Sequence, residues 1–366
     1  MKNAGKTSTK YKFVFETLRK QILAGDYSHD QKFPSELMLA RRFKVSRPTI
    51  SRALLDLKSA GFLEGRVGSG TYLGPEARAF AGYIGMIIPD RDWNMFFSAV
   101  ANAFETAASK HGFTVLKDDC FTKGEEARAA QMAQLAAEFA KKHVRGILVA
   151  PFDASEMSAE ATHRMFAELE KSDIPIVLLD RDIVPLSSRS RYDLVSSDNF
   201  AAGRRLAAHF IAMGAKRLAF LTIPHSGSAV QERIIGFAQT VRNAGLPWTK
   251  SSVLTFDATN VQAVQRLFST KQAPDAIGCR NDHVAAYLLQ TLANLKIDVP
   301  KRVRIGAFDD CKLAQMLTPP LTSVHQPTSA IADAAFTTLL ERIRNPSAPA
   351  RKILLDVTLS VRASSM

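Results

Sequence analysis

Short apolar segments alternate with amphipathic segments over most of this chain, and the alternation limits the folds that it can adopt. A continuous apolar strand is buried on both faces, and amphipathic helices between such strands supply the cover. The pattern therefore predicts an α/β fold built from parallel sheets with helices on both sides. The predicted strands are residues 83–89, 113–117, 146–151, 175–180, 217–223, 253–256, 276–279 and 303–308. The predicted helices are residues 96–111, 125–142, 158–171, 199–213, 231–244, 261–269 and 282–295.

These elements fall into two consecutive series, which predicts two doubly wound lobes within residues 82–366. We expect the first lobe to hold about residues 82–192 and 323–345, and the second about residues 193–322 and 346–366. Ligands of doubly wound sheets bind beyond the carboxyl ends of the strands. A ligand cleft is therefore expected between the lobes.

Composition places the chain among globular proteins. Its 366 residues are 46% hydrophobic and 23% charged, which is enough apolar material for two or three cores. No apolar run reaches the roughly 18 residues of a membrane span, and no apolar stretch follows the basic N-terminus. We therefore expect no membrane segment and no secretory signal, and hence a cytoplasmic protein. Three widely spaced cysteines predict neither disulfides nor a metal site, and no cofactor is expected.

The positive charge is concentrated at the N-terminus. The whole chain carries a net charge of +13, and residues 1–75, with 14 Lys or Arg against 6 Asp or Glu, hold +8 of it. A small basic unit joined to a nearly balanced one is typical of proteins that bind a polyanion such as DNA. Charge alone also fits a solvated surface, so the interpretation depends on the pattern within the segment.

That pattern is a helix-turn-helix. Apolar residues recur at helical spacing over residues 11–24, and a second helix is expected after Ser35, which suits an N-cap. A third helix is expected over residues 47–60, with Pro48 in its first turn, where the missing N–H breaks no hydrogen bond. Two short helices across a tight turn are the unit that enters the DNA major groove.

A β-hairpin is expected next, over residues 64–73. Two strands flank the turn Gly68-Ser69-Gly70, and Arg66 lies at its base. A phosphate-binding glycine loop would instead lie between a strand and a helix. The flanking strands therefore favour a wing over a nucleotide-binding loop.

Residues 10–74 resemble the GntR-type winged helix-turn-helix. The resemblance is carried by six motifs in order: Pro34-Ser35-Glu36, Leu39-Ala40, Val45-Ser46-Arg47-Pro48-Thr49, Ala53-Leu54 with Leu57, Gly61-Phe62-Leu63 and Gly68-Ser69-Gly70-Thr71-Tyr72. It implies a DNA-binding domain at residues 8–74 and a linker at residues 75–81. The DNA-contacting residues that it implies are Ser35, Arg41, Arg47, Pro48, Thr49, Ser51, Arg52, Arg66, Gly68, Ser69 and Gly70. The family often has arginine where this chain has Leu37 and Ser51, so its operator sequence does not carry over.

Polar and aromatic side chains collect at the predicted strand ends of the larger domain. Asp90 with Trp93 and Phe96 follows the first strand, and Asp180-Arg181, Arg233, Asn281-Asp282 and Asp309-Asp310 follow later ones. Carboxylates, amides and guanidinium groups suit the hydroxyls of a sugar, and aromatic faces cover its apolar side. Any one of these residues could instead cap a helix or bridge the lobes.

The same domain resembles the effector domain of LacI/GalR-type repressors, which is similar to periplasmic sugar-binding proteins. The resemblance is carried by Val177-Leu178-Leu179-Asp180-Arg181, Ser197-Asp198-Asn199, Arg233 with Gly236-Phe237, Asn281-Asp282, Gly306-Ala307-Phe308-Asp309-Asp310 and Leu321 to Pro327. It implies effector contacts at Trp93, Phe96, Asp180, Arg233, Asn281, Asp309 and Gln326. The chain is thus similar to hybrid repressors that join a GntR reader to a LacI-like sensor, as in arabinose-responsive repressors.

We therefore expect a homodimeric transcriptional regulator, a repressor, whose affinity for a double-stranded DNA operator is controlled by a small carbohydrate-like effector. An enzyme is the first alternative, with Asp90 or Asp309-Asp310 as acid–base groups. The sequence contains no nucleophile elbow, Walker loop or zinc-protease motif, so no catalytic residue is assigned. A sugar-transport binding protein is the second alternative, and the basic N-terminal unit argues against it.

Overall fold

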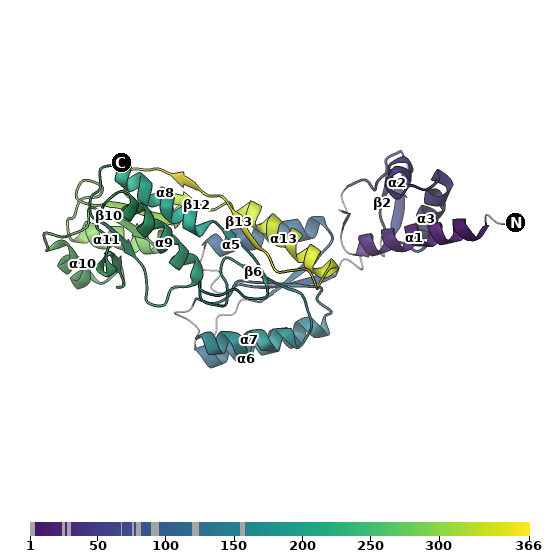
Figure 1. Ribbon diagram of the computed structural model, residues 1–366, viewed down its shortest axis with the longest axis horizontal. Coiled ribbons are helices and arrows are strands. Elements are labelled where there is room, and N and C mark those ends of the chain that lie inside the picture. Colours follow the sequence, from purple (N-terminus) through teal and green to yellow (C-terminus); the bar gives the residue numbers. More distant parts are fainter. Residues whose placement is uncertain are drawn as a thin grey trace.

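The structure is a computed structural model that describes residues 4–23, 26–27, 31–66, 68–74, 77, 82–88, 95–118, 124–153 and 158–366. A small N-terminal domain lies at one end of an elongated two-lobed body (Figure 1). The expected fold class is confirmed in both parts: the N-terminal domain is a winged helix-turn-helix, and the larger domain, called the effector domain below, is built on two mainly parallel sheets. The N-terminal domain is called the reader below.

The N-terminal domain is a winged helix-turn-helix. Its elements are α1 (Ala4–Leu23), α2 (Glu36–Phe43), α3 (Arg47–Ser59), β1 (Leu63–Arg66) and β2 (Gly70–Leu73). Ser35 caps α2 by accepting a hydrogen bond from the Met38 backbone N–H, and Lys44 ends that helix in a left-handed conformation. The antiparallel strands β1 and β2 pair Leu63 with Leu73, and both side chains are buried in the same core as α1 and α3.

Lobe 1 is a six-stranded sheet in the order β13-β7-β6-β5-β3-β4. Its strands are β3 (Tyr83–Ile87), β4 (Thr114–Asp118), β5 (Ile147–Val149), β6 (Ile176–Leu179), β7 (Asp193–Ser197) and β13 (Lys352–Leu355), and its helices are α5 (Met95–Lys110), α6 (Glu125–Lys141), α7 (Ala159–Glu170) and α13 (Thr328–Arg344). Helices α5 and α13 share one core with one face of the sheet. Helices α6 and α7 cover the other face, as Figure 1 shows.

Lobe 2 has the same layered plan, with the strand order β14-β12-β11-β10-β8-β9. Its strands are β8 (Leu218–Leu221), β9 (Val253–Leu254), β10 (Ala276–Cys279), β11 (Arg304–Asp309), β12 (Thr322–His325) and β14 (Thr358–Ser360). Its helices are α8 (Asn199–Ala212), α9 (Ser228–Asn243), η1 (Lys250–Ser252), α10 (Val261–Phe268), α11 (Asp282–Asn294) and α12 (Lys312–Met316). Helices α8 and α9 pack on one face and α10 and α11 on the other.

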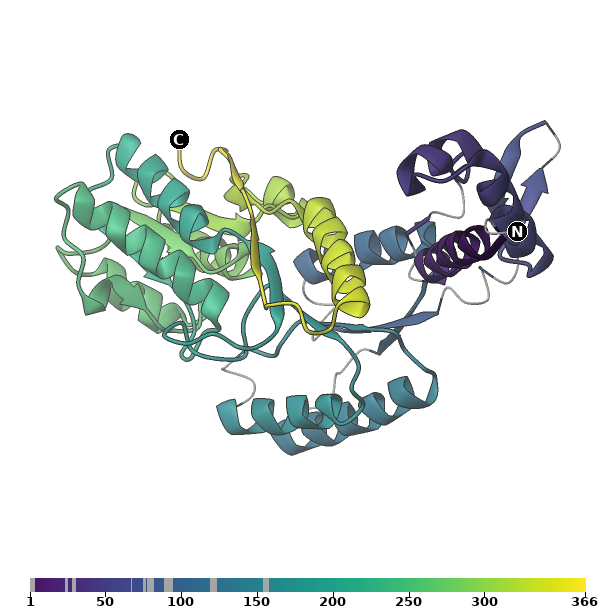
Figure 2. The same ribbon diagram turned by 45° about the vertical axis from the view of Figure 1, so that its right-hand side comes forward.

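The expected lobe boundaries were wrong by one strand at each crossing. Strand β7 belongs to lobe 1, β12 to lobe 2 and β13 to lobe 1, so the chain crosses between lobes after Ser197, after His325 and between β13 and β14. Figure 2 shows the last crossing as the yellow strand that runs from one lobe to the other. Strand β7 escaped prediction because it is polar. Asp193 is buried against Arg342, and Ser196 donates to the Asp180 carbonyl, so hydrogen bonds and an ion pair replace apolar packing.

None of the described helices is both long enough and apolar enough to cross a membrane.

Helices α8 and α9 pack closely because each places a glycine against the other's backbone. A Cβ added to Gly203 would lie 1.9 Å from the Arg233 carbonyl oxygen, and one added to Gly236 would lie 2.0 Å from the Phe200 carbonyl oxygen. The contact sets the position of Arg233, whose side chain points into the cleft between the lobes.

We predict that Gly203→Ala lowers the free energy of unfolding by about 1–3 kcal/mol, because the backbone of α9 must move to admit the methyl group. Chemical denaturation measures the change. Ala208→Ser, at an exposed position of the same helix, should change it by less than about 0.5 kcal/mol. A Gly203→Ala variant as stable as the natural chain would show that the helices are not in backbone contact.

Candidate functional sites

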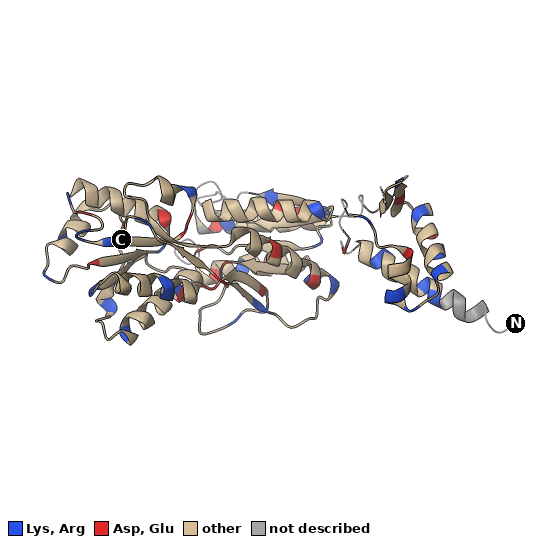
Figure 3. Cartoon of the chain, turned by 90° about the horizontal axis from the view of Figure 1, so that it is seen from above, with Lys and Arg blue, Asp and Glu red and all other residues tan. Residues whose placement is uncertain are grey.

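Most of the expected DNA-contacting residues lie exposed on the N-terminal domain. Figure 3 shows Lys and Arg residues distributed over its helices. The exposed members of the expected set are Ser35, Arg41, Arg47, Pro48, Arg52, Arg66, Gly68 and Ser69, while Ser51 and Gly70 are half-buried. Thr49 differs, because it is 7% exposed and its hydroxyl lies 2.8 Å from that of Ser46.

Two arginines of the reader are held by neighbouring side chains. Arg47, at the start of α3, donates from Nε to Glu36 at 3.2 Å. The Arg52 guanidinium lies 4.8 Å from the centre of the Tyr11 ring, so α1 supports its position. These contacts are exposed and weak, so both arginines remain available to phosphates or base edges.

The wing has the backbone that its glycines require. Gly68 and Gly70 have φ values of 71° and 127°, which side chains other than glycine rarely adopt. Lys32 packs on Gly70, where a Cβ would lie 2.1 Å from the lysine Cε. The Phe33 backbone N–H also donates to Thr71 at 2.7 Å. The segment before α2 is thereby attached to the wing, which places a lysine that the sequence had not indicated beside its turn.

The second site is a cavity between the lobes, where the carboxyl ends of both parallel sheets meet. Its free volume is about 30 Å³, well below the roughly 300–1,000 Å³ of small-molecule sites, so a sugar would fit only if the lobes or the lining side chains moved apart. Its lining residues are Phe96, Phe97, Asp180, Arg181, Arg233, Arg280, Asn281 and Asp309. The structure thus brings together Phe96, Asp180, Arg233, Asn281 and Asp309 of the expected set, whereas Trp93 lies outside the described residues.

Arg233 is the most constrained side chain of the cavity. It is 5% exposed, and it donates from Nε to the Asn199 side chain and from Nη1 to the Arg280 carbonyl, both at 2.8 Å. Its guanidinium carbon lies 4.8 Å from the centre of the Phe308 ring, and Nη1 lies 3.8 Å from Asp309 Oδ1. The side chain is therefore fixed in place before any ligand arrives.

Asp309 is tied to the crossing segments behind the cavity. Gln326 donates from Nε2 to Asp309 Oδ1 at 2.6 Å and accepts from the Ser197 hydroxyl at 2.6 Å. Ser197 and Gln326 each sit at a crossing between lobes, so Gln326 connects the pocket to the hinge although it does not line the cavity. Burial raises the pKa of Asp309 to about 7, against the opposing effect of Arg233.

The aromatic side of the cavity consists of Phe96 and Phe97, whose rings are 5.3 Å apart. Asn281 caps α11 with its side-chain oxygen, which accepts from the Val284 N–H at 3.0 Å. Asp180 contacts Arg181 at 3.0 Å. The cavity thus brings carboxylates and guanidinium groups next to two buried aromatic rings.

Not all of the strand-end carboxylates face the cavity. Asp282 is fully buried, accepting from Ser323 at 2.6 Å and from the Cys311 N–H at 2.9 Å. Asp310 binds Arg362 and Ser360 of the C-terminal segment. Both therefore have the internal structural roles that the sequence had left open.

Three lining residues were not among the expected effector contacts, although the strand-end pattern includes Arg181. Phe97 and Arg181 directly follow Phe96 and Asp180, and Arg280 directly precedes Asn281. All three lie next to expected residues, so the pattern of polar residues at the strand ends located the cavity correctly. The pattern gave no way to tell which neighbour faces the cleft.

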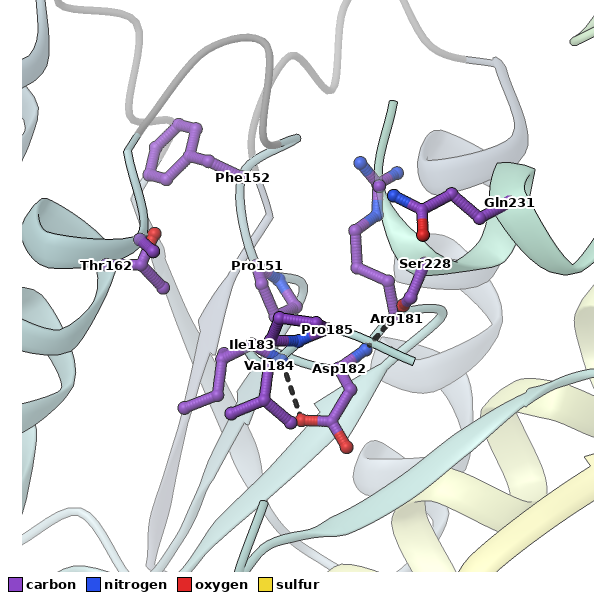
Figure 4. Close-up of a pocket in the computed structure, with 12 residues that line it drawn as sticks. Pro151, Phe152, Thr162, Arg181, Asp182, Ile183, Val184, Pro185, Ser228 and Gln231 are labelled. Carbon is purple, nitrogen blue, oxygen red and sulfur yellow. Dashed lines mark hydrogen bonds between the residues drawn. The ribbon is translucent and has the colours of Figure 1, made fainter. Parts of the chain in front are cut away.

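A second, outer pocket opens beside the cavity, between α7 and the start of α9. Pro151, Ile183, Val184 and Pro185 give it an apolar wall, and Gln231 and Ser228 face it from lobe 2 (Figure 4). Arg181 lines both this pocket and the cavity.

Comparison with known proteins identifies both domains. Residues 10–73 match the model of the bacterial regulatory proteins of the gntR family, and residues 207–365 match that of the periplasmic binding protein-like domain. The HTH-type transcriptional repressor PurR of Vibrio vulnificus is 30% identical over 283 residues, covering 76% of this chain and 80% of its own. The ribose operon repressor of Escherichia coli is 27% identical, covering 77% of this chain and 82% of its own.

A solved structure shares the fold of the two-lobed domain. It is a LacI family transcriptional regulator from Enterococcus faecium with bound ribose, 22% identical, with a TM-score of 0.63, covering 77% of this chain and 98% of its own. These relatives are transcriptional regulators rather than enzymes. The chain belongs to the LacI-type family of bacterial transcriptional repressors and carries a DNA-binding domain of the gntR family in front of its effector domain.

Proposed function

We propose that this regulator represses transcription by binding a DNA operator as a homodimer, and that a neutral single-ring sugar in the interlobe cavity releases it. The main support for a sugar effector is the set of residues that line the cavity. Its accessible lining is mainly carboxylate, amide and guanidinium groups, which supply hydrogen bonds, and the rings of Phe96 and Phe97 lie behind them, 6% and 3% exposed.

Charge balance favours a neutral effector over a phosphorylated one. Three arginines at the described cavity, Arg181, Arg233 and Arg280, are matched by Asp153, Asp180 and Asp309 within contact distance. A phosphate would add buried negative charge without an unmatched cation to receive it. Because the E. faecium neighbour was solved with ribose and the E. coli relative is a ribose operon repressor, ribose is the first sugar to test.

Binding of the sugar would change the angle between the lobes, and with it the spacing of the two readers of a dimer. Exposed apolar side chains at Tyr287 of α11, 53% exposed, and Met316 of α12, 80% exposed, support a homodimer through lobe 2. Light scattering of the purified chain tests this assembly. A regulator that binds DNA works where the chromosome lies, so we place it in the cytoplasm.

The effector class is tested by a thermal-shift screen against ribose, other pentoses, hexoses, disaccharides and sugar phosphates. A ligand at 100 times its Kd adds about 2.7 kcal/mol of stability. We expect shifts with single-ring neutral sugars, and with ribose 5-phosphate a smaller shift than with ribose. A larger shift with the phosphate would contradict the charge argument.

We predict that Arg233→Ala abolishes sugar binding, because it removes the fixed donor and leaves Asp309 without its cation. Isothermal titration measures the affinity for the sugar. Binding to an operator selected from random DNA shows whether the DNA-binding domain is still active. Arg242→Ala, on the exposed side of the same helix, is the matched control. Undiminished sugar affinity in Arg233→Ala would place the effector elsewhere.

We predict that Arg47→Ala weakens operator binding by about 1–3 kcal/mol and leaves sugar binding intact. Arg47 begins the recognition helix and is exposed there. Fluorescence anisotropy of a labelled operator compares the Kd of this variant with that of the natural chain, and Arg302→Ala in lobe 2 is the control. An unchanged operator Kd would show that Arg47 does not contribute to the DNA interface.

We predict that sugar affinity rises with pH and levels off above the raised pKa of Asp309, about 7. A sugar hydroxyl donates better to the ionised carboxylate, so at lower pH binding must first release the proton. The Kd should be about tenfold weaker one pH unit below that pKa than on the plateau. Calorimetric titrations with sugar at several pH values test this, and in Asp309→Asn the Kd should no longer depend on pH. A Kd that stays constant with pH in the natural chain would show that sugar binding does not release a proton from Asp309.

A further inference from the structure

Asp153 lies between the lobes, and donors from both reach its carboxylate. It follows β5 in lobe 1 and accepts at Oδ2 from Arg181 of the same lobe at 3.0 Å. From lobe 2, Arg280 donates to the same oxygen at 3.3 Å, and the Gly227 backbone N–H donates to Oδ1 at 3.0 Å. The carboxylate therefore joins two strand ends of opposite sheets and the start of α9.

The start of α9 is built to admit this carboxylate. A Cβ on Gly227 would lie 3.2 Å from Arg181 Cδ, which is a tight contact, and 3.6 Å from Asp153 Oδ2, which is an ordinary one, so a larger residue would press on the arginine. The adjacent Ser228 accepts from the Asp182 N–H of lobe 1 at 3.1 Å. Two neighbouring residues of α9 thus contact lobe 1 at this one place, and the N-terminal end of a helix favours negative charge.

The bridge is buried, which makes its charges depend on one another. The side chains of Asp153, Arg181 and Arg280 are 5%, 11% and 16% exposed. Burial lowers the pKa of Arg280, and Asp153 opposes that effect. If the lobes separated, Asp153 would keep Arg181 but lose both of its donors from lobe 2.

Both arginines of the bridge also line the sugar cavity. Arg280 has a second connection to it, because its carbonyl oxygen holds Nη1 of Arg233. On its other side, Arg181 borders the outer pocket, where Figure 4 shows its side chain next to Gln231 and Ser228. Arg181 therefore lies between the cavity and the outer pocket.

We propose that Asp153 is the positioning residue of effector binding: by holding Arg181 and Arg280 across the closed cleft, it sets both arginines toward the sugar and joins sugar binding to lobe closure. The proposal rests on the proposed function for the identity of the ligand, but the bridge itself can be tested without sugar. Arg280 becomes a further effector-contacting residue, one whose place depends on a carboxylate of the opposite lobe.

The experiment compares Asp153→Asn, Arg280→Met and Arg280→Lys with the natural full-length chain. Calorimetric titration with D-ribose gives the affinity, and small-angle X-ray scattering without sugar gives the radius of gyration. We expect Asp153→Asn and Arg280→Met to weaken ribose binding about tenfold or more, because a partner of a buried ion pair is lost. The same two variants should expand in the absence of sugar. Arg280→Lys, which keeps the charge, should recover most of the affinity.

Arg302→Gln, an exposed arginine of lobe 2, is the matched control and should change neither quantity. Thermal melts establish that each variant is folded, and Arg280→Met, which breaks the bridge from the other lobe, covers the case in which Asp153→Asn is not. Natural affinity and an unchanged radius in Asp153→Asn and Arg280→Met would overturn the proposal. So would an affinity loss without expansion, since Asp153 would then act within lobe 1 alone.

If the natural chain binds no ribose, the proposed effector fails, and the scattering comparison alone decides about the bridge. Expansion of the two variants would still support it, and equal radii would refute it.

Discussion

Buried charge in the cleft has to be compensated across the two lobes, and the rest of the effector domain is arranged around that requirement. Isolated guanidinium groups cannot be removed from water without carboxylates or carbonyls to receive their hydrogen bonds. In this chain the compensating groups come from different strand ends: Asp153 and Asp180 from lobe 1, and Asp309 from lobe 2. A cleft with this composition is complete only when both sheets present their carboxyl ends to each other.

The parallel sheets make that meeting possible. Every strand that contributes to the cavity ends on the same side of its sheet, so short loops bring residues distant in sequence together. The three crossings are the links between the lobes, and residues that contact the pocket lie beside them. Gln326 stands at one crossing, bonded to Ser197 at another and to Asp309 in the pocket. In the proposed mechanism a change in lobe angle would therefore alter the pocket, and by reciprocity a ligand in the pocket would alter the angle.

The fold could largely be predicted from the sequence, because apolar strands between amphipathic helices have few alternative arrangements. Prediction failed for the C-terminal elements, among them α13 and the apolar strand β13, and for the polar strand β7. Strand β7 contains Asp193, Ser196 and Ser197, all buried through ion pairs and hydrogen bonds that no hydrophobic pattern records. The strand ends correctly predicted the location of the cavity. The contact between Asp153 and Arg280 could not be predicted, because it depends on how the two sheets face each other. In the reader, burial of Thr49 depends on its bond to Ser46, which spacing alone does not specify.

The central claim is that a sugar in the cavity controls the DNA reader at the far end of the molecule. The direct measurement is fluorescence anisotropy of a labelled operator, selected from random DNA, bound to the natural full-length chain and titrated with ribose or the best sugar of the screen. The account predicts loss of anisotropy with a midpoint near the Kd that calorimetry gives for the same sugar. Operator affinity that stays constant while calorimetry shows the cavity saturated would contradict it.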